Sequence, residues 1–274
     1  MKEKTERVDV LLVQQQLIDT REKAKRSIMA GLVFAGSERI DKPGTKLPIN
    51  TSLRVKGKEH PYVGRGGLKL EKAISHFSLD LTGKIMVDIG ASTGGFTDCA
   101  LQNGATLVYA VDVGTNQLAW SLRSNAQVVV MEKTNFRYAT KDMFDRGQPT
   151  VASIDVSFIS LGQMFPPLKE IVAENADIIA LIKPQFEAGR ELVGKKGIVK
   201  DKSVHLQVIV DVIAKAEEKG FNCEQLTYSP ITGGDGNIEF LAHFKAGPAS
   251  SSVTKEAAQE AVNLAHEALR KASD

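Results

Sequence analysis

The sequence has only two cysteines, Cys99 and Cys223, which lie far apart and in no metal-ligand spacing. Two thiols are too few for a disulfide scaffold, which fits a reducing compartment. The five histidines are also scattered, so the sequence predicts no zinc site. The first ten residues have no apolar core of signal-peptide length, and we therefore expect a cytoplasmic protein.

Long apolar runs are missing as well. The strongest run, residues 178–182, is far shorter than the roughly 20 residues that span a bilayer, so we expect no membrane partner. The formal net charge is only +2, but the charge is unevenly distributed. Residues 1–60 contain 13 Lys or Arg and 8 Asp or Glu, a net of +5, which leaves −3 for the rest. The front of the chain is therefore suited to receive a polyanion.

The 274 residues allow one large domain and a small one. Residues 1–60 predict a small α+β module, with helices over 7–16 and 20–30 and short strands over 32–34 and 52–55. Thr20 is the expected N-cap of the second helix, and Gly31 is its expected end. Prolines and glycines then predict a basic hinge over 61–66, followed by a helix over 67–76.

From residue 84 onward, apolar strands alternate with helices. We expect strands over 85–89, 107–111, 128–131, 151–155, 178–183, 225–228 and 238–244. The helices between them are expected near 95–103, 115–123, 161–174 and 202–219. This alternation predicts a doubly wound, mostly parallel sheet.

The last two strands are separated only by a glycine-rich turn over 232–237. A parallel crossover needs about a dozen residues, so this pair must form an antiparallel hairpin. A parallel sheet closed by such a hairpin is the class I methyltransferase pattern, a Rossmann-like α/β fold. We assign this domain to residues 67–246, and we assign residues 247–274 to a linker and a C-terminal helix over 253–271.

A glycine-rich turn, MVDIGASTGGF, follows the first strand, but its spacing differs from the dinucleotide fingerprint. Asp88 precedes the turn, where a carboxylate attracts the ammonium and sulfonium charges of S-adenosylmethionine and repels a pyrophosphate. Asp112 ends the second strand, about 20 residues after the glycines, where an acid can bind both ribose hydroxyls. After the third strand, the Asn135 side chain can bond the adenine amino group, and the Phe136 amide can bond a ring nitrogen.

The expected cofactor set gathers at these strand ends: Asp88, Gly90, Ala91, Ser92, Gly94, Gly95, Phe96, Asp112, Val113, Asn135, Phe136 and Asp155. The alternative is that Asp88 and Asp112 only cap helices and that the glycines only turn the chain.

Four ionisable residues fall at the ends or starts of elements that border one cleft. Lys69 comes from the helix before the first strand, Asp155 and Lys183 end the fourth and fifth strands, and Glu239 opens the last strand. A lysine at the end of a buried strand is costly unless it is paired or functional. These residues are therefore candidates for a catalytic site, although two acids and two bases can also form a purely structural ion-pair network.

The chain resembles the TlyA family, sometimes labelled hemolysin A, whose catalytic domain is similar to FtsJ-type ribose methyltransferases. The resemblance extends to about residue 246 and rests on RVDVLLVQQQL, GRGGLKL, VDIGASTGGFTD, YAVDVG, TNFR, DVSFIS, LIKPQFE and GNIEFL. It implies a Lys-Asp-Lys-Glu tetrad for 2′-O-methylation at Lys69, Asp155, Lys183 and Glu239. It also implies S-adenosylmethionine as cofactor, and ribosomal RNA or ribosomal subunits as partner, with a cytidine ribose as target.

The mechanism that we expect is an in-line attack of the ribose 2′-hydroxyl on the sulfonium methyl group. A neutral Lys183 would act as general base or position the nucleophile. Lys69 would favour the neutral form through like-charge repulsion, whereas Asp155 and Glu239 would orient the lysines and oppose this effect.

The first 60 residues resemble the αL RNA-binding motif of a small-subunit ribosomal protein and of pseudouridine synthases. The resemblance is carried by Arg7, Asp9, Leu11, Leu17, Thr20, Arg21, Ala24, Ile28, Gly31 and Val33. We expect Arg7, Arg21, Lys25 and Arg26 to bind phosphates, and Arg65 to carry RNA toward the active site. The loop 184–200, with Lys195 and Lys196, is a candidate lid. The alternative for all these cations is an ordinary solvated surface.

Two rival functions stay open. The hemolysin label suggests a membrane-active cytolysin, and the RNA-binding module suggests a non-enzymatic assembly factor.

Overall fold

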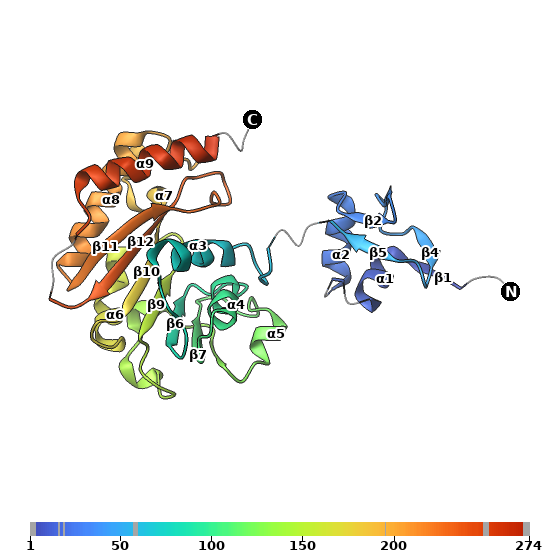
Figure 1. The fold of residues 1–274 in the computed structure, drawn as a ribbon, viewed down its shortest axis with the longest axis horizontal. Coiled ribbons are helices and arrows are strands. Elements are labelled where there is room, and N and C mark those ends of the chain that lie inside the picture. Colours follow the sequence, from blue (N-terminus) through green and yellow to red (C-terminus); the bar gives the residue numbers. More distant parts are fainter. Residues whose placement is uncertain are drawn as a thin grey trace. The chain divides into compact units, whose positions relative to one another are not determined.

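The computed structural model describes residues 4–15, 17–18, 20–56, 60–194, 196–248 and 252–270. The chain divides into two compact units, Met1–Pro61 and Tyr62–Asp274 (Figure 1). Each unit has hydrophobic clusters of its own.

The first unit packs two helices, α1 (Val8–Gln14) and α2 (Arg21–Met29), on short strands. β1 (Thr5–Arg7) pairs with β4 (Lys46–Pro48), and β2 (Val33–Ala35) lies between β3 (Glu38–Arg39) and β5 (Leu53–Val55). The predicted N-cap is confirmed, because the Thr20 hydroxyl accepts a hydrogen bond from the Lys23 amide. β1, β3 and β4 were not expected, since strands of two or three residues are too short to show an alternating pattern.

The second unit is built on a sheet of seven strands in the order β11-β12-β10-β9-β6-β7-β8 (Figure 1). Its strands are β6 (Ile85–Ile89), β7 (Leu107–Val111), β8 (Val128–Met131), β9 (Val151–Ile154), β10 (Asp177–Ile182), β11 (Phe221–Tyr228) and β12 (Phe240–Ala246). β6 to β10 run parallel, whereas β12 lies antiparallel between β10 and β11. The predicted mostly parallel sheet with a C-terminal antiparallel hairpin is therefore confirmed.

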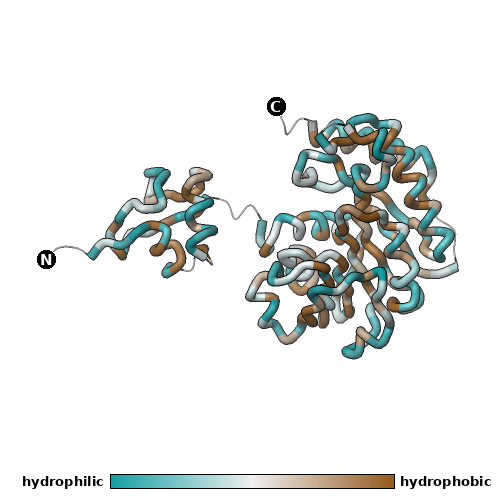
Figure 2. Tube along the Cα trace, turned by 180° about the vertical axis from the view of Figure 1, so that it is seen from behind, coloured by the Kyte–Doolittle hydropathy of each residue, from teal (hydrophilic) through white to brown (hydrophobic). Residues whose placement is uncertain are grey.

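Helices cover both faces of this sheet. On one face lie α3 (Gly67–Phe77), α4 (Gly95–Gln102) and α5 (Trp120–Arg123); on the other lie α6 (Phe165–Ile171), α8 (Lys202–Glu217) and α9 (Lys255–Arg270). Neighbouring strand residues face opposite layers: Met86 packs toward α3 and α4, whereas Val87 packs toward α6 and α8. In Figure 2 the central strands are accordingly brown, while the outer segments show much more teal.

Two expected helices are shorter than predicted. The helix expected over 115–123 is reduced to α5, because Asn116 has a left-handed φ of 55° that breaks a helix there. The helix expected over 161–174 splits into η3 (Leu161–Gln163) and α6. Pro166 and Pro167 lack an amide hydrogen and are accommodated only in the first turn of a helix, so α6 begins beside them.

The expected hinge over 61–66 needs a correction, since residues 62–66 belong to the second unit. The Tyr62 ring is buried, and its hydroxyl donates a 2.7 Å hydrogen bond to Glu71. The Val63 amide donates a 2.7 Å hydrogen bond to Asp98 on α4. Burial of an aromatic ring outweighs the flexibility that the neighbouring glycines suggested. Residues 57–59 lie outside the described residues.

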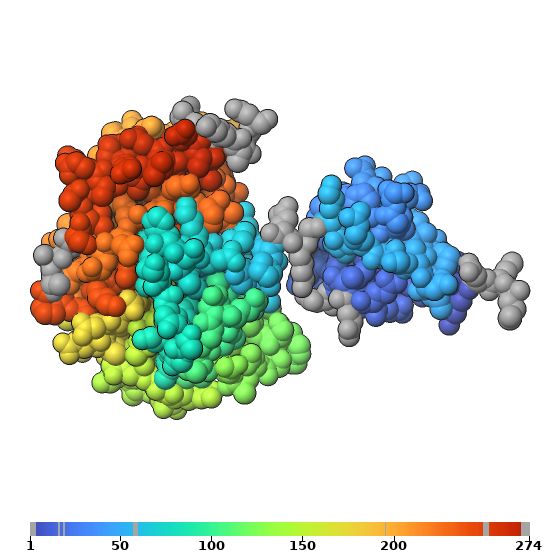
Figure 3. Space-filling model, viewed as in Figure 1, coloured from blue at the N-terminus to red at the C-terminus, as the bar shows by residue number. Residues whose placement is uncertain are grey.

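The C-terminal helix α9 is also part of the second unit. Its apolar face, which includes Ala258, Val262 and Ala265, packs on α8 and β11. Figure 3 shows the α9 atoms in red, directly against the orange atoms of the preceding segments. Among the described residues, no helix is both long and apolar enough to cross a bilayer.

Candidate active site

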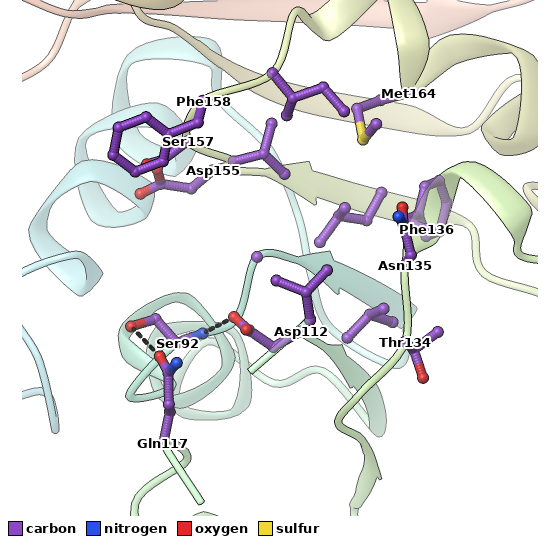
Figure 4. A pocket seen from close by; sticks show the side chains of 16 residues that line it. Ser92, Asp112, Gln117, Thr134, Asn135, Phe136, Asp155, Ser157, Phe158 and Met164 are labelled. Atoms are coloured by element: carbon purple, nitrogen blue, oxygen red, sulfur yellow. Dashed lines mark hydrogen bonds between the residues drawn. The ribbon is translucent and has the colours of Figure 1, made fainter. Parts of the chain in front are cut away.

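A cavity of about 400 Å³ opens at the carboxyl ends of β6, β7, β8 and β9. Figure 4 shows Ser92, Asp112 and Gln117 on one side of it, and Asp155 and Phe158 on the opposite side. The carboxyl ends of parallel strands meet at one edge of a sheet, where ligands of such folds bind. The expected residues Gly90, Val113, Asn135 and Phe136 also line this cavity.

The glycine turn after β6 brings backbone close to backbone. Gly90 has a left-handed φ of 87°, and a Cβ atom there would collide with the Asp155 carbonyl. A Cβ atom at Gly95 would lie 2.8 Å from the Gly67 nitrogen. Both glycines are therefore required by space, because protein backbone occupies the positions that their Cβ atoms would take.

Asp112 is held at the end of β7 by the backbone. Its Oδ2 accepts a 2.8 Å hydrogen bond from the Ser92 amide, and its Oδ1 accepts a 2.7 Å bond from the Gly114 amide. Each carboxylate oxygen keeps a further lone pair. Asp112 thus faces the cavity in a fixed orientation and can still accept two hydroxyl donors.

Asn135 caps the short helix η1 (Phe136–Tyr138), and this occupies the acceptor that we expected for adenine. Its Oδ1 accepts hydrogen bonds from the Arg137 amide (3.2 Å) and the Arg137 Nε (3.3 Å). A carbonyl oxygen has two lone pairs, so an adenine amino group would have to displace the Arg137 guanidinium. The Phe136 side chain is buried and lines the cavity.

Asp88 does not face the cavity, and the expected contact with the cofactor charges is corrected here. Its side chain is fully buried; Oδ2 accepts from the Thr97 amide and hydroxyl, and Oδ1 accepts from the Ser153 hydroxyl. Burial raises the pKa of Asp88 to about 6, against the opposing effect of the Thr97 and Ser153 hydrogen bonds. Asp88 therefore ties the first turn of α4 to β6 and β9, which matches the alternative of a helix cap.

Gly94, another expected cofactor residue, also serves packing. It lines neither of the two cavities described here, and it has a left-handed φ of 94°. A Cβ atom at this position would collide with Leu118 and Leu122. Its role is to begin α4 closely against the segment that carries α5.

A second cavity of about 250 Å³ adjoins the first and shares Gly90, Ser92 and Asp155 with it. The expected residues that line this second cavity are Arg65, Lys69, Ala91, Gly95 and Phe96. The two cavities thus meet at the glycine turn and at the carboxylate of Asp155.

The four candidate catalytic side chains form one connected cluster around Asp155, although Lys183 and Glu239 line neither of the two cavities. Lys69 Nζ lies 3.3 Å from Asp155 Oδ2 and 2.9 Å from Glu239 Oε2. Lys183 Nζ lies 2.5 Å from Asp155 Oδ1. The charges therefore alternate along one chain of contacts, in the order Lys183, Asp155, Lys69, Glu239.

This cluster is largely shielded from water. The side chains of Lys69 and Lys183 are each 9% exposed, and that of Glu239 is 3% exposed. Burial alone would raise the pKa of Asp155, but the charges and hydrogen bonds of the two lysines outweigh it and hold this pKa below its ordinary value. Asp155 is thus the ionised centre of the cluster.

Sequence reasoning missed two polar partners of the cluster. The Ser157 hydroxyl accepts a 3.1 Å hydrogen bond from Lys183 Nζ, and the Gln185 amide donates a 3.3 Å bond to Glu239 Oε1. Both lie two residues after a member of the tetrad, in the DVS and KPQ segments. A polar residue at that spacing was the feature of the sequence from which these two partners could have been predicted. In the part of the chain that the structure describes, no group of three His, Cys, Asp or Glu could hold a metal ion.

Three of the cations expected to bind RNA form ion pairs within the first unit. Arg7 and Arg21 both pair with the buried Asp9, at 2.8 Å and 3.0 Å, and Lys25 pairs with Glu22 at 2.7 Å. The arginine side chains are nevertheless 41% and 54% exposed. The following residue on α2, Arg26, is exposed. In the candidate lid, Lys196 is exposed and Lys195 lies outside the described residues.

Comparison with known proteins agrees with this geometry. The FtsJ-like methyltransferase family model matches residues 62–246. The chain is 55% identical over 273 residues to the Bacillus subtilis protein "Putative rRNA methyltransferase YqxC", covering 98% of this chain and 97% of that one. It is 40% identical over 241 residues to "16S/23S rRNA (cytidine-2'-O)-methyltransferase TlyA" of Mycobacterium tuberculosis, covering 86% and 88%.

Among solved structures, the fold matches "Putative hemolysin from Streptococcus thermophilus" with a TM-score of 0.80 and 52% identity, over 98% of both chains. The family model matches most of the chain, and the Bacillus and Streptococcus relatives share more than half of their aligned residues with it. The chain belongs to the FtsJ-like methyltransferase family.

Proposed function

We propose that this protein methylates a ribose 2′-hydroxyl of ribosomal RNA, with S-adenosylmethionine as methyl donor and cytidine as target nucleoside. The single observation that carries the proposal is the buried chain of contacts from Lys183 through Asp155 and Lys69 to Glu239, beside a cavity of about 400 Å³. The names of the Bacillus and Mycobacterium relatives support RNA as substrate, and the latter supports cytidine.

The residues at the two cavities fit an adenosyl donor. Gly90 and Gly95 let the turn after β6 pack closely against Asp155 and Gly67 beside the two cavities, and Asp112 presents two fixed oxygens to ribose hydroxyls. When bound, S-adenosylmethionine supplies an electrophilic methyl group on a sulfonium. Asp155 lines both cavities, so a donor bound there would lie beside the tetrad.

The proposed chemistry uses Lys183 as the group that accepts the proton of the 2′-hydroxyl. Lys183 would act after its ammonium has lost a proton to solvent, because a neutral amine has two N–H groups and one lone pair, whereas the ammonium has no lone pair. Asp155 and Ser157 accept the two N–H groups, which leaves the lone pair for the incoming hydroxyl. As the oxygen–methyl bond forms, the methyl–sulfur bond breaks and the hydroxyl proton moves to Lys183 Nζ. Alignment of the two reactants can contribute on the order of 7–11 kcal/mol.

Lys69 and Glu239 complete the arrangement without needing to touch the proton. Lys69 holds Asp155 from the side opposite Lys183, and Glu239 neutralises Lys69 within the buried cluster. Both would keep the Asp155 carboxylate, and through it Lys183, in one orientation. Preorganised charges of this kind are a general source of catalytic power.

RNA would reach this site from the cavity mouth, where Phe158 is 90% exposed and Arg65 lines the second cavity. Exposed aromatic rings are surfaces on which unstacked bases lie. The first unit, with Arg7, Arg21 and Arg26, would supply phosphate contacts of low sequence specificity. With ribosomal RNA as substrate, we also propose a cytoplasmic location.

The test is to incubate the protein with radiolabelled S-adenosylmethionine and purified ribosomal subunits and to map the labelled nucleotide. We expect label on a ribose, loss of labelling in Lys183→Ala, and unchanged labelling in Lys169→Ala, an exposed lysine on α6. Turnover retained in Lys183→Ala would remove this residue from the mechanism. Lysis of lipid vesicles by pure protein, without RNA methylation, would instead support the hemolysin names.

A further inference from the structure

The segments after β9 and after β10 are joined side chain to side chain. Lys183 contacts Ser157 at 3.1 Å, and the rings of Phe186 and Phe158 lie 4.8 Å apart. Glu187 ends α7 (Pro184–Glu187) and completes the series. Three successive contacts therefore connect the segment that carries Lys183 with residues 157–161.

Glu187 makes the strongest and most buried of these contacts. Its Oε1 accepts a 2.6 Å hydrogen bond from the Leu161 amide, and its Oε2 accepts a 2.7 Å bond from the Ser160 hydroxyl. The side chain is 3% exposed, and the Lys215 ammonium lies 3.9 Å away. A buried carboxylate that accepts two short hydrogen bonds fixes the groups that donate them.

The segment that Glu187 holds is one wall of the cofactor cavity. Val156, Ser157, Phe158, Ile159 and Met164 all line that cavity. In Figure 4 the labelled members Ser157, Phe158 and Met164 lie along one side, across from Asp112 and Ser92.

This wall is not held in place by backbone preference. Phe158 has a left-handed φ of 64°, which is rare for a bulky residue and persists only where the surroundings impose it. Lys183 holds Ser157 on one side of Phe158, and Glu187 holds Ser160 and Leu161 on the other.

We propose that Glu187 is a positioning residue that holds the 156–164 wall in its cofactor-binding arrangement by clamping Ser160 and Leu161. This inference rests on the proposed function, since it concerns the same cavity. Glu187 lines neither cavity, and its hydrogen bonds go to Ser160 and Leu161 rather than to the tetrad, so it would act on the methyl donor through the wall. When the clamp is removed, the wall relaxes and the ligand must reorder it on binding.

The test measures the affinity of full-length protein for S-adenosylhomocysteine by calorimetry, which needs neither RNA nor turnover. We expect Glu187→Ala to weaken binding about tenfold, because two donors lose their acceptor. Ser160→Ala loses one contact, and about a threefold loss is expected. Glu187→Gln should stay near wild type, since its carbonyl can accept from Leu161 while its amide donates to Ser160. Glu191→Ala, an exposed acid four residues later, is the matched control.

Kinetics separate positioning from general damage. In Glu187→Ala, KM for S-adenosylmethionine should rise about tenfold, while kcat at saturating donor changes less than threefold, because Lys183 keeps Asp155 and the bound donor reorders the wall. A fall in kcat at constant KM would overturn the proposal. The proposal would also be overturned if a folded Glu187→Ala protein bound S-adenosylhomocysteine as tightly as Glu191→Ala does. If Glu187→Ala does not fold, the same comparison is made with Ser160→Ala. Wild-type protein that binds no S-adenosylhomocysteine would overturn the proposed function as well, whereas wild-type binding with unaffected variants overturns only this inference.

Discussion

The two lysines of the tetrad should differ sharply in what their removal does to stability. Lys69 contacts two acids, Asp155 at 3.3 Å and Glu239 at 2.9 Å, whereas Lys183 contacts one acid, Asp155. When Lys183 is replaced by Met, Asp155 keeps Lys69. When Lys69 is replaced by Met, Asp155 keeps Lys183, but the 3% exposed Glu239 keeps only a 3.3 Å contact with the Gln185 amide among its described side-chain partners.

The magnitude follows from leaving a buried charge without its partner, which costs about 3–5 kcal/mol. We expect Lys69→Met to lose about that much unfolding free energy, and Lys183→Met to lose about 1–2 kcal/mol. Domains are typically stable by only about 5–15 kcal/mol, so the difference should be plain in urea titrations followed by circular dichroism. Both variants should lose methyl transfer. They would then differ in unfolding free energy although they are equally inactive, so the contribution of each lysine to stability can be told apart from its part in the reaction.

The double variant Lys69→Met/Glu239→Gln decides whether the unpaired charge is the cause. Replacing the carboxylate by an amide removes the charge that Lys69→Met leaves behind, so the double variant should recover at least half of the lost stability. Equal costs for the two lysine variants would refute this account of the cluster. A double variant as unstable as the sum of its single changes would refute it too.

Three further predictions concern other sites. Asp88→Asn should flatten the pH dependence of stability. Because burial raises the pKa of Asp88 to about 6, the protonated carboxyl stabilises the wild type below about pH 4, and on the order of 3 kcal/mol of unfolding free energy is lost as the pH rises to about 6. The urea midpoints of the two proteins should therefore diverge over that range, and parallel curves would contradict the assignment. Asp112→Asn should weaken S-adenosylhomocysteine binding about tenfold in calorimetry, because one fixed acceptor becomes a donor, and unchanged affinity would exclude Asp112 from the ribose contact. Arg26→Gln should lower the slope of log affinity for RNA against log salt by about 1, without destabilising the first unit, and an unchanged slope would remove Arg26 from the phosphate contacts.

Much of the fold could be predicted from local patterns. The positions of β6 to β9 agree with the expected strands within one residue, because buried parallel strands appear as short apolar runs between turn residues. β11 extends four residues further toward the N-terminus than expected, and it carries a bulge between Cys223 and Gln225. A bulge interrupts the alternation from which a strand is recognised.

The candidate site was predicted in part for the same reason. Residues at strand ends, such as Asp112 and Asp155, lie at the cavity because parallel strands end at one edge. Asp88 was placed there by the same reasoning, but it lies inside β6 and its side chain points toward Thr97 and Ser153. Which layer a strand residue faces depends on the helix that covers it, and a linear pattern does not contain that information.

The sequence alone determined the order of strands and helices, the antiparallel closing hairpin and the residue types available at the strand ends, because these depend on periodicity and connection length. Only the tertiary structure decided that Lys69 bridges two acids, that Glu187 clamps the wall around Phe158, and that residues 62–66 pack on α3 and α4. Those contacts join segments up to 170 residues apart. Their geometry follows from how the layers pack, and packing is a property of the whole unit rather than of any segment.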